Sequence, residues 1–195
     1  MAIPLRCRCG KLQGELDVSK VAARAVCYCK DCQAFARFLK AEDLVLDASG
    51  GTEVEAALPA AVRFTSGLEH LACMSLSPKG IYRWYASCCN TPIGNTPRNP
   101  KMPYVGLVRA CLAATPAELD LRLGQGRMTA NVGSAYGPAQ ATPLRSVLAV
   151  AGIGAMFVKA RLSGEWRDNP FFDASGAPVR APQVLTRAAR AAITR

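Results

Sequence analysis

The sequence lacks the features that would direct the chain out of the cytoplasm. Its first ten residues, MAIPLRCRCG, contain no apolar segment of the kind found in signal peptides. Its longest apolar run, Val147 to Val158, stops at Lys159, and no segment reaches the length expected of a membrane span. The cysteines do not show the even spread of a secreted disulfide framework. These absences predict a reduced, cytoplasmic protein without a membrane partner.

Histidine and acidic residues are also scarce. The single histidine, His70, lies far along the chain from every cysteine group, so we expect it at the start of a strand rather than in a site. Against 24 Lys and Arg stand 14 Asp and Glu, which gives a net charge of +10. Much of this excess lies in the tail, between Arg180 and Arg195. A solvated basic helix is the simpler interpretation, and nucleic acid stays open as a less favoured partner.

Cysteine, by contrast, is plentiful and grouped. Seven of the nine cysteines fall in three tight groups: Cys7 and Cys9; Cys27, Cys29 and Cys32; Cys88 and Cys89. Cys73 and Cys111 stand alone in apolar segments, so we expect them to be buried.

The middle group has the spacing of a metal knuckle. Its CxCxxC pattern lets three thiolates converge on one thiophilic cation, and zinc is the default because it accepts sulfur ligands without redox chemistry. Three protein ligands with an open fourth position are typical of sites that bind a substrate or water. A fourth ligand from elsewhere would instead make a closed structural site, and a reduced buried cluster without metal is the remaining interpretation.

Hydrophobic periodicity predicts a mainly β fold of small coiled antiparallel sheets around the cysteine zinc knuckles, with C-terminal helices. The expected strands are Leu12–Val18, Val21–Tyr28, Leu44–Leu46, Val62–Thr65, His70–Leu76, Ile81–Ala86 and Tyr104–Leu112; the expected helices are Asp31–Leu39, Val147–Leu162 and Gln183–Ile193. Residues 1–115 would form a zinc-binding β domain, and residues 116–195 an extension packed on it. Trp166, Phe171 and Phe172 suggest a loop anchored by aromatic residues.

The order of the motifs resembles the glutathione-dependent formaldehyde-activating enzyme family, which includes relatives of centromere protein V. That family has an early CxCG, a CxCxxC, and a strand with serine, glycine and arginine before a CxxCG. Here CRCG begins at Cys7, CYCKDC begins at Cys27, and the strand residues are Ser77, Gly80 and Arg83. The resemblance covers about the first 115 residues, and it implies a structural zinc on the first and last groups and an active-site zinc on the middle one.

The last motif departs from that pattern. Ala86 stands where the family has its first cysteine, and Asn90 stands where it has glycine. Asparagine is the best substitute for glycine at positive φ. Cys88 is the favoured fourth ligand beside Cys7, Cys9 and Cys89, but an outside ligand or loss of this site stays open.

The resemblance implies a zinc-dependent carbon-sulfur lyase that acts on the adduct of a small thiol, such as glutathione, with a small aldehyde. Up to two zinc ions would bind, and Cys27, Cys29 and Cys32 would form the catalytic site. A zinc-stabilised binding module, with nucleic acid as one partner, is the alternative. We expect Lys30 and Arg37 to be surface residues, whereas the sequence leaves open whether Arg83 faces the site or packs in a strand.

Overall fold

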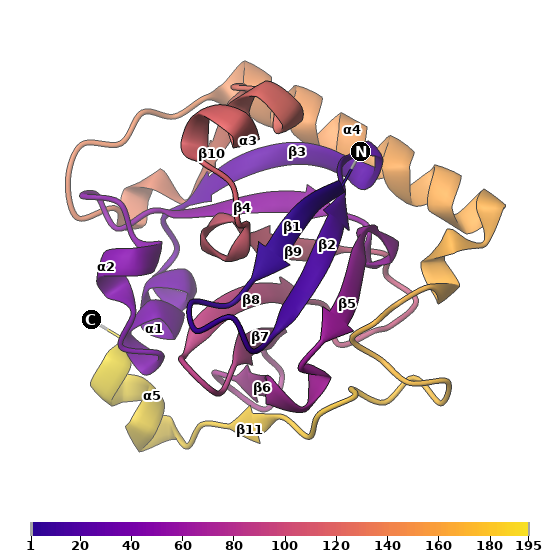
Figure 1. The fold of residues 1–195 in the computed structure, drawn as a ribbon. Helices are drawn as coiled ribbons and strands as arrows, with labels where there is room; N and C mark the ends of the chain where they lie inside the picture. The colour runs from indigo at the N-terminus through magenta and orange to yellow at the C-terminus, as the bar shows by residue number, and fades with distance from the viewer. Residues whose placement is uncertain (1, 195) are drawn as a thin grey trace.

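The structure, a computed structural model, describes residues 2–194 (Figure 1). Its strands are β1 Ala2–Arg6, β2 Gln13–Asp17, β3 Val21–Cys27, β4 Thr52–Ala57, β5 Val62–Ser66, β6 Leu71–Ser75, β7 Tyr82–Ala86, β8 Thr91–Thr96, β9 Val105–Val108, β10 Arg127–Ala130 and β11 Gln183–Val184. Its α-helices are α1 Lys30–Phe38, α2 Glu42–Val45, α3 Pro116–Leu123, α4 Pro143–Ser163 and α5 Arg187–Ile193.

Two sheets form the body of the molecule. The larger has eight strands in the order β10-β3-β4-β9-β8-β7-β6-β11, and the smaller has three in the order β1-β2-β5. The six inner strands of the large sheet are antiparallel, whereas β10 pairs parallel with β3 and β11 pairs parallel with β6. The fold is therefore mixed α/β. The three-stranded sheet is a small antiparallel sheet, as expected, but the large sheet is mixed because the C-terminal part adds a parallel strand to each of its edges.

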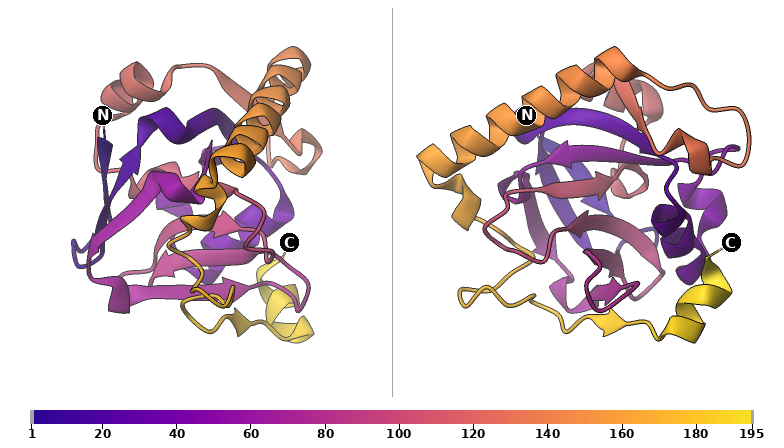
Figure 2. Two further views of the ribbon diagram at one scale, coloured as in Figure 1. Left: turned by 90° about the vertical axis from the view of Figure 1, so that its right-hand side faces the viewer. Right: turned by 180° about the vertical axis from the view of Figure 1, so that it is seen from behind.

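Residues 116–194 therefore lie along two opposite sides of the sheet. Figure 2 shows α4 running beside β3 at one side, while β11 and α5 continue along the other. Between them, Phe171 and Phe172 enter the core, where the Phe171 ring lies 5.1 Å from that of Trp84. This confirms the expected loop anchored by aromatic residues. The added strands also cover sheet edges that would otherwise expose unpaired backbone groups.

Strand alternation places two cores on opposite faces of the large sheet. Trp84 on β7 faces the three-stranded sheet, with Ile3, Leu16 and Leu107 in the same cluster. Its neighbour Arg83 faces the other way and lies over the Phe35 ring of α1, with 5.4 Å between the guanidinium carbon and the ring centroid. This alternation answers the question about Arg83 that the sequence left open, because it brings the guanidinium to the face that carries α1.

Several local expectations are confirmed. Strand β2 and the hairpin of β6 and β7 lie where the periodicity predicted them, and Leu12 and Leu16 are fully buried. Cys73 and Cys111 are buried. His70 lies just before β6, with a side chain 30% exposed and 3.6 Å from Glu69.

Other local expectations are wrong. Leu44–Leu46 was expected as a strand, but most of it belongs to helix α2, and the long strand expected to Leu112 ends at Val108. The helix expected from Gln183 begins at Arg187, after the short strand β11. The helix expected at Val147–Leu162 is also longer than expected, because α4 extends from Pro143 to Ser163. Helix α4 has 21 residues and is long and apolar enough, by length and composition alone, to cross a membrane.

Candidate metal centres

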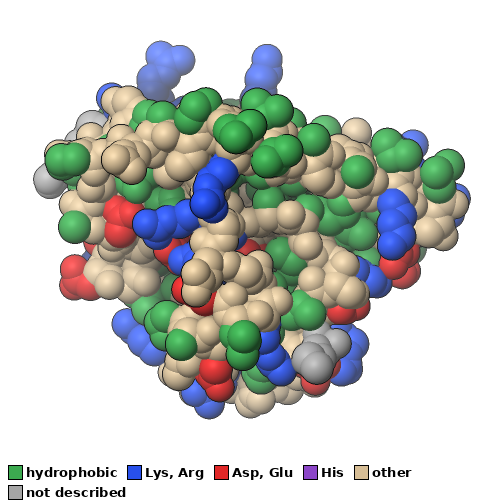
Figure 3. Space-filling model, turned by 90° about the horizontal axis from the view of Figure 1, so that it is seen from above, with side chains coloured by type: hydrophobic (Ala, Val, Ile, Leu, Met, Phe, Trp, Pro, Cys, Tyr) green, Lys and Arg blue, Asp and Glu red, His purple; other side chains and the backbone are tan. Residues whose placement is uncertain are grey.

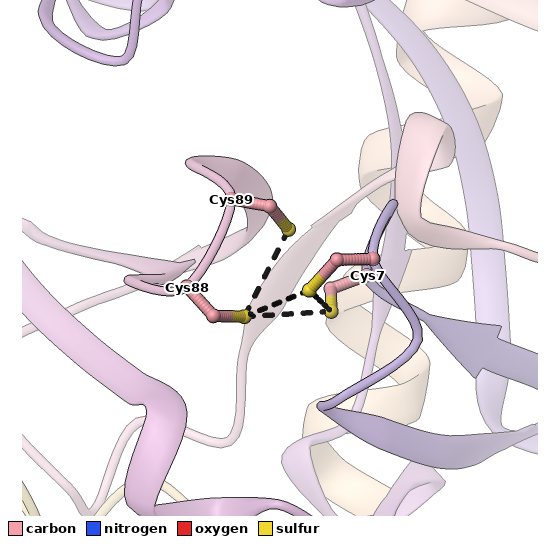
Figure 4. A group of neighbouring side chains, drawn as sticks. Cys7, Cys88 and Cys89 are labelled. Carbon is pink, nitrogen blue, oxygen red and sulfur yellow. Dashed lines mark hydrogen bonds between the residues drawn. The ribbon is translucent and has the colours of Figure 1, made fainter.

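The first cysteine group lies where the β1–β2 connection meets the turn between β7 and β8. Cys7 and Cys9 come from the connection, and the turn contributes Cys88 and Cys89. The four sulfur atoms lie within 4.8 Å of one another. Figure 4 shows Cys88 and Cys89 of the turn pointing toward Cys7. The structure thus brings Cys88 into the group, whereas Ala86 is buried in the core.

The sulfur spacing fits one tetrahedral metal ion. Sulfurs bound to zinc at about 2.3 Å in a tetrahedron lie about 3.8 Å apart. Here the Cys7–Cys9, Cys7–Cys88 and Cys88–Cys89 separations are 3.6, 3.7 and 3.9 Å, and Cys9–Cys88 is 3.3 Å. Four cysteines at this spacing can form a closed tetrahedral site without a water ligand.

Backbone geometry explains how adjacent cysteines can share one site. Neighbouring side chains in an extended strand point to opposite faces, but Ser87–Asn90 form a turn rather than a strand. Asn90 closes this turn at φ 54°, and Gly10 on the opposing loop has φ 78°. The left-handed position of Asn90 agrees with its place in the motif, where the resembled family has glycine. The turn therefore supplies two sulfurs from consecutive residues.

The protein environment of the first group favours a thiolate at Cys89. The Leu12 amide donates to the Cys7 sulfur at 3.3 Å. Burial raises the pKa of the Cys89 thiol, but hydrogen bonds involving Thr91 and Cys9 outweigh it and lower that pKa to about 6. Burial and the neighbouring Cys9 raise the pKa of Cys88. A thiolate at Cys89 next to a protonated Cys88 is the state expected before a cation replaces the Cys88 proton.

The second group contains three sulfurs at the start of α1. Cys27 ends β3, Cys29 is the N-cap of α1, and Cys32 lies in its first turn, with the three sulfur atoms within 4.8 Å of one another. The Cys32 amide donates to the Cys29 sulfur at 3.3 Å, which confirms the prediction that the helix begins at the knuckle. The positive end of the helix dipole favours thiolates here.

Three residues that the cysteine spacing could not reveal approach this group. Asn131 donates to the Cys27 sulfur at 3.5 Å, and Arg83 Nη1 lies 4.0 Å from the Cys32 sulfur. The third residue is Tyr104. Burial raises its pKa most, the charges of Cys27 and Cys32 raise it further, and the resulting value of about 12 keeps the hydroxyl protonated. Asn131 comes from the C-terminal part, in a segment without a clear periodic pattern, and no sequence signal connects it to the knuckle.

Protonation is shared unequally among the three sulfurs. Hydrogen bonds from Cys29 and Cys32 hold the pKa of Cys27 far below its usual range, and the same bonds raise the pKa values of Cys29 and Cys32. The group therefore holds one thiolate at neutral pH. Among residues 2–194, no fourth Cys, His, Asp or Glu side chain joins it.

Gly106 leaves space for the side chains of Tyr104 and Asn95. A Cβ at Gly106 would lie 2.9 Å from the Tyr104 hydroxyl oxygen and 3.0 Å from Asn95 Oδ1. Any larger residue would therefore push these two polar groups away from the strand. Gly106 keeps the Tyr104 hydroxyl and the Asn95 amide together over β9.

A cavity of about 730 Å³ lies along α1, although none of the seven grouped cysteines lines it. It begins at Lys30, next to Cys29, and its wall includes Gln33 and Arg37. Lys30 is exposed, as expected. Arg37 is not a free surface residue, because it bonds the Ile193 carbonyl at 2.7 Å and also Tyr136.

Fold and site together define a mixed α/β protein with two cysteine groups, of four and three sulfurs, each of which could hold a metal ion such as zinc. The chain belongs to a family described as a family of unknown function (DUF6151), whose pattern matches residues 1–181. This description does not confirm the family that the motif order resembles, although the two cysteine groups are consistent with zinc sites of that kind.

Other comparisons add little. No curated protein matches the chain. A crystal structure of a Rhodobacter sphaeroides protein is similar at a TM-score of 0.40 and 19% identity, over 64% of this chain and 98% of that one. A score this low supports no statement about function.

The two groups predict different outcomes on mutation. Cys27→Ala should remove one metal ion per chain and leave the protein folded, because the three-sulfur group lies at a helix start and does not close a core. Elemental analysis and circular dichroism of the purified variant would measure both quantities. Loss of the folded spectrum on this substitution would show that the second site is structural.

Proposed function

We propose that the protein is a zinc-dependent carbon-sulfur lyase that acts on the adduct of a glutathione-type thiol with a small aldehyde. The observation that carries this proposal is the three-sulfur group, without a fourth protein ligand among residues 2–194, beside the buried cation Arg83. The order of the cysteine motifs and its resemblance to the formaldehyde-activating family also support it. Cys27, Cys29 and Cys32 would hold the zinc, which would supply a positive charge that lowers the pKa of a nearby thiol.

The reaction is an addition. The thiol sulfur forms a bond to the carbonyl carbon, the carbonyl π bond breaks, and the proton lost from sulfur ends on the aldehyde oxygen. Arg83 supplies a fixed positive charge beside the sulfurs. The Tyr104 hydroxyl remains a hydrogen-bond donor at neutral pH, and it can stabilise the negative charge that develops on that oxygen.

The cavity along α1 suits a peptide thiol. Lys30 and Arg37 line it together with Glu42, Asp43 and Asp47. Glutathione carries both an ammonium group and carboxylates at neutral pH, so a wall of mixed charge can pair with each. Lys30, which lines this cavity, directly follows Cys29 in the sequence.

The proposal predicts that glutathione binds with release of a proton. Its apparent affinity should therefore rise with pH until the pKa of the free thiol is reached. Calorimetry in buffers of different ionisation enthalpy counts the proton, and a formaldehyde addition assay measures turnover. Cys32→Ser should abolish both signals, whereas Cys111→Ser, at a buried cysteine outside both groups, should retain them.

Two results would refute this function. If the wild type and Cys32→Ser bound glutathione equally poorly, and neither accelerated its addition to formaldehyde, the enzyme proposal would fail. Retention on nucleic acid that weakens steeply as salt rises would instead support the zinc-stabilised binding module. The chain's net charge of +10 gives that alternative its physical basis.

A further inference from the structure

Helix α4 leaves an unusually large apolar surface in contact with solvent. Of its most apolar 18-residue window, 6% is buried in the structure. Leu144, Val147, Leu148, Val158 and Leu162 are each at least 60% exposed. Figure 3, seen from above, shows hydrophobic side chains following one another along this part of the molecule. Extended apolar patches of this kind mark interaction sites.

The exposed residues form one face of the helix. At about 100° per residue, Leu144, Leu148, Ala155 and Leu162 point in nearly the same direction, with Val147, Ala151 and Val158 beside them. All these residues are exposed. The opposite direction is taken by Ile153, Met156 and Ala160, which are half-buried or buried against the body. The outward face therefore contains only apolar side chains.

The charged side chains of α4 itself are all basic. Arg145 and Lys159 lie on one flank of the apolar face, and Arg161 lies on the other. From Leu121 to Gly164 the sequence contains five basic residues and no acidic one. Among residues 2–194, neither Arg145 nor Lys159 forms an ion pair. Such flanking cations can extend to anionic groups above an apolar layer.

A small cavity of about 260 Å³ adjoins the same flank. Arg24, Arg127 and Arg145 line it together with Leu148. Arg24 pairs with Glu53 and Asp120, and Arg127 also pairs with Glu53. Arg145 is therefore the guanidinium group on this wall that can contact a phosphate whose attached hydrocarbon continues over α4.

The fold does not allow α4 to cross a bilayer. Before the helix, Thr129 on β10 bonds Thr142, so the N-terminal end is attached to the large sheet. After the helix, Phe171 and Phe172 pack in the core that contains Trp84 of the same sheet. A spanning α4 would place these two attachments on opposite sides of the membrane and break the core. The helix can therefore only lie along a surface.

We propose that α4 is a membrane-docking helix that lays its apolar face into the interface of a bilayer rich in anionic phospholipid. The apolar face enters the acyl boundary, and the flanking cations contact lipid phosphates. A second copy of this chain is a poorer occupant because it would bring two positively charged surfaces together. This role is independent of the cysteine sites, and it departs from the expectation of a protein without a membrane partner.

The test is co-sedimentation of the full chain with vesicles of phosphatidylcholine alone and of its equimolar mixture with phosphatidylglycerol. We expect strong binding to the mixed vesicles only, with affinity falling as salt rises. Leu148→Glu combined with Val158→Glu should lower the affinity at least tenfold. The matched control is Leu68→Glu combined with Val184→Glu, since both residues are 41% exposed and lie away from α4. Arg145→Gln and Lys159→Gln should each lower it about fivefold.

Circular dichroism would establish that every variant keeps its fold. The proposal is wrong if the folded wild type does not bind the mixed vesicles. It is also wrong if the α4 variant and its control bind them equally. A wild-type dimer that the same α4 variant converts to monomer, without any vesicle binding, would identify a second copy as the true occupant.

Discussion

Replacing Cys88 with alanine should remove one metal ion per chain and leave the protein unfolded at room temperature. A closed site of four cysteines contributes its binding free energy directly to folding, about 10–16 kcal/mol in zinc-finger peptides at neutral pH. That contribution equals or exceeds the whole stability of a typical domain, about 5–15 kcal/mol. Cys88 is the decisive position because Ala86 occupies the place where the resembled motif has cysteine.

Elemental analysis and circular dichroism of the variant measure both effects, and a chelator added to the wild type should produce the same loss of structure. Cys111→Ala is the matched control, since Cys111 is fully buried but belongs to neither group. It should cost about 0.5–3 kcal/mol and keep its metal. A Cys88→Ala protein that stays folded with full metal content would show that Cys7, Cys9 and Cys89 recruit another ligand.

The cysteine groups were predictable from sequence because metal chemistry restricts their spacing. Three sulfurs within six residues can converge without help from distant parts of the chain, and Cys27, Cys29 and Cys32 do so at the helix start. The first group required two distant segments to meet. Only the order of motifs connected Cys7 with Cys89, and the structure brings these segments together through the turn that Asn90 closes.

The sheet was less predictable because pairing between distant strands leaves little local trace. Strand β4 lies between β3 and β9 in the large sheet, yet its sequence TEVEAA carries two glutamates. One of them, Glu55, is buried beside Arg109 rather than exposed to solvent. The polar residues that approach the second cysteine group were invisible for the same reason. Asn131 reaches Cys27 from 104 residues away.

Helix α4 shows a different limit. A helix was expected from Val147 to Leu162, and the helix forms from Pro143 to Ser163. What periodicity could not show is that a face rich in leucine and valine remains in solvent. An apolar helix is normally read as a core element. Instead, the face of α4 that packs against the sheet is the one around Ala149, Ile153 and Ala160, which are half-buried or buried.

The second large effect is expected at the ion pair of Arg109 and Glu55. Arg109 Nη1 lies 3.0 Å from Glu55 Oε1, and the Glu55 side chain is completely buried. Arg109 also pairs with Glu53 and Asp120, which are about a third exposed. Arg109→Met would leave the Glu55 carboxylate buried without this cation. Removal of one partner from a buried pair costs about 3–5 kcal/mol.

The pH dependence of this penalty identifies its cause. Burial raises the pKa of Glu55, and Arg109 acts in the opposite direction, so the substitution should raise that pKa further. A carboxyl group whose pKa is higher in the folded than in the unfolded chain favours folding at low pH, and this advantage is lost as pH rises through the folded pKa. The destabilisation by Arg109→Met should therefore be largest at neutral pH and shrink toward the unfolded pKa of about 4.3.

Urea denaturation at several pH values measures this difference. The matched control is Arg63→Met, because Arg63 forms a single ion pair with Glu15 at 2.7 Å while its side chain is 69% exposed. An exposed pair contributes about 0–1 kcal/mol, so the control should change stability little at any pH. Adding Glu55→Gln to Arg109→Met should recover stability at neutral pH, because the amide carries no charge to desolvate. If Arg109→Met were no more destabilising than the control, or if its penalty grew as the pH fell, the buried carboxylate would not be the cause.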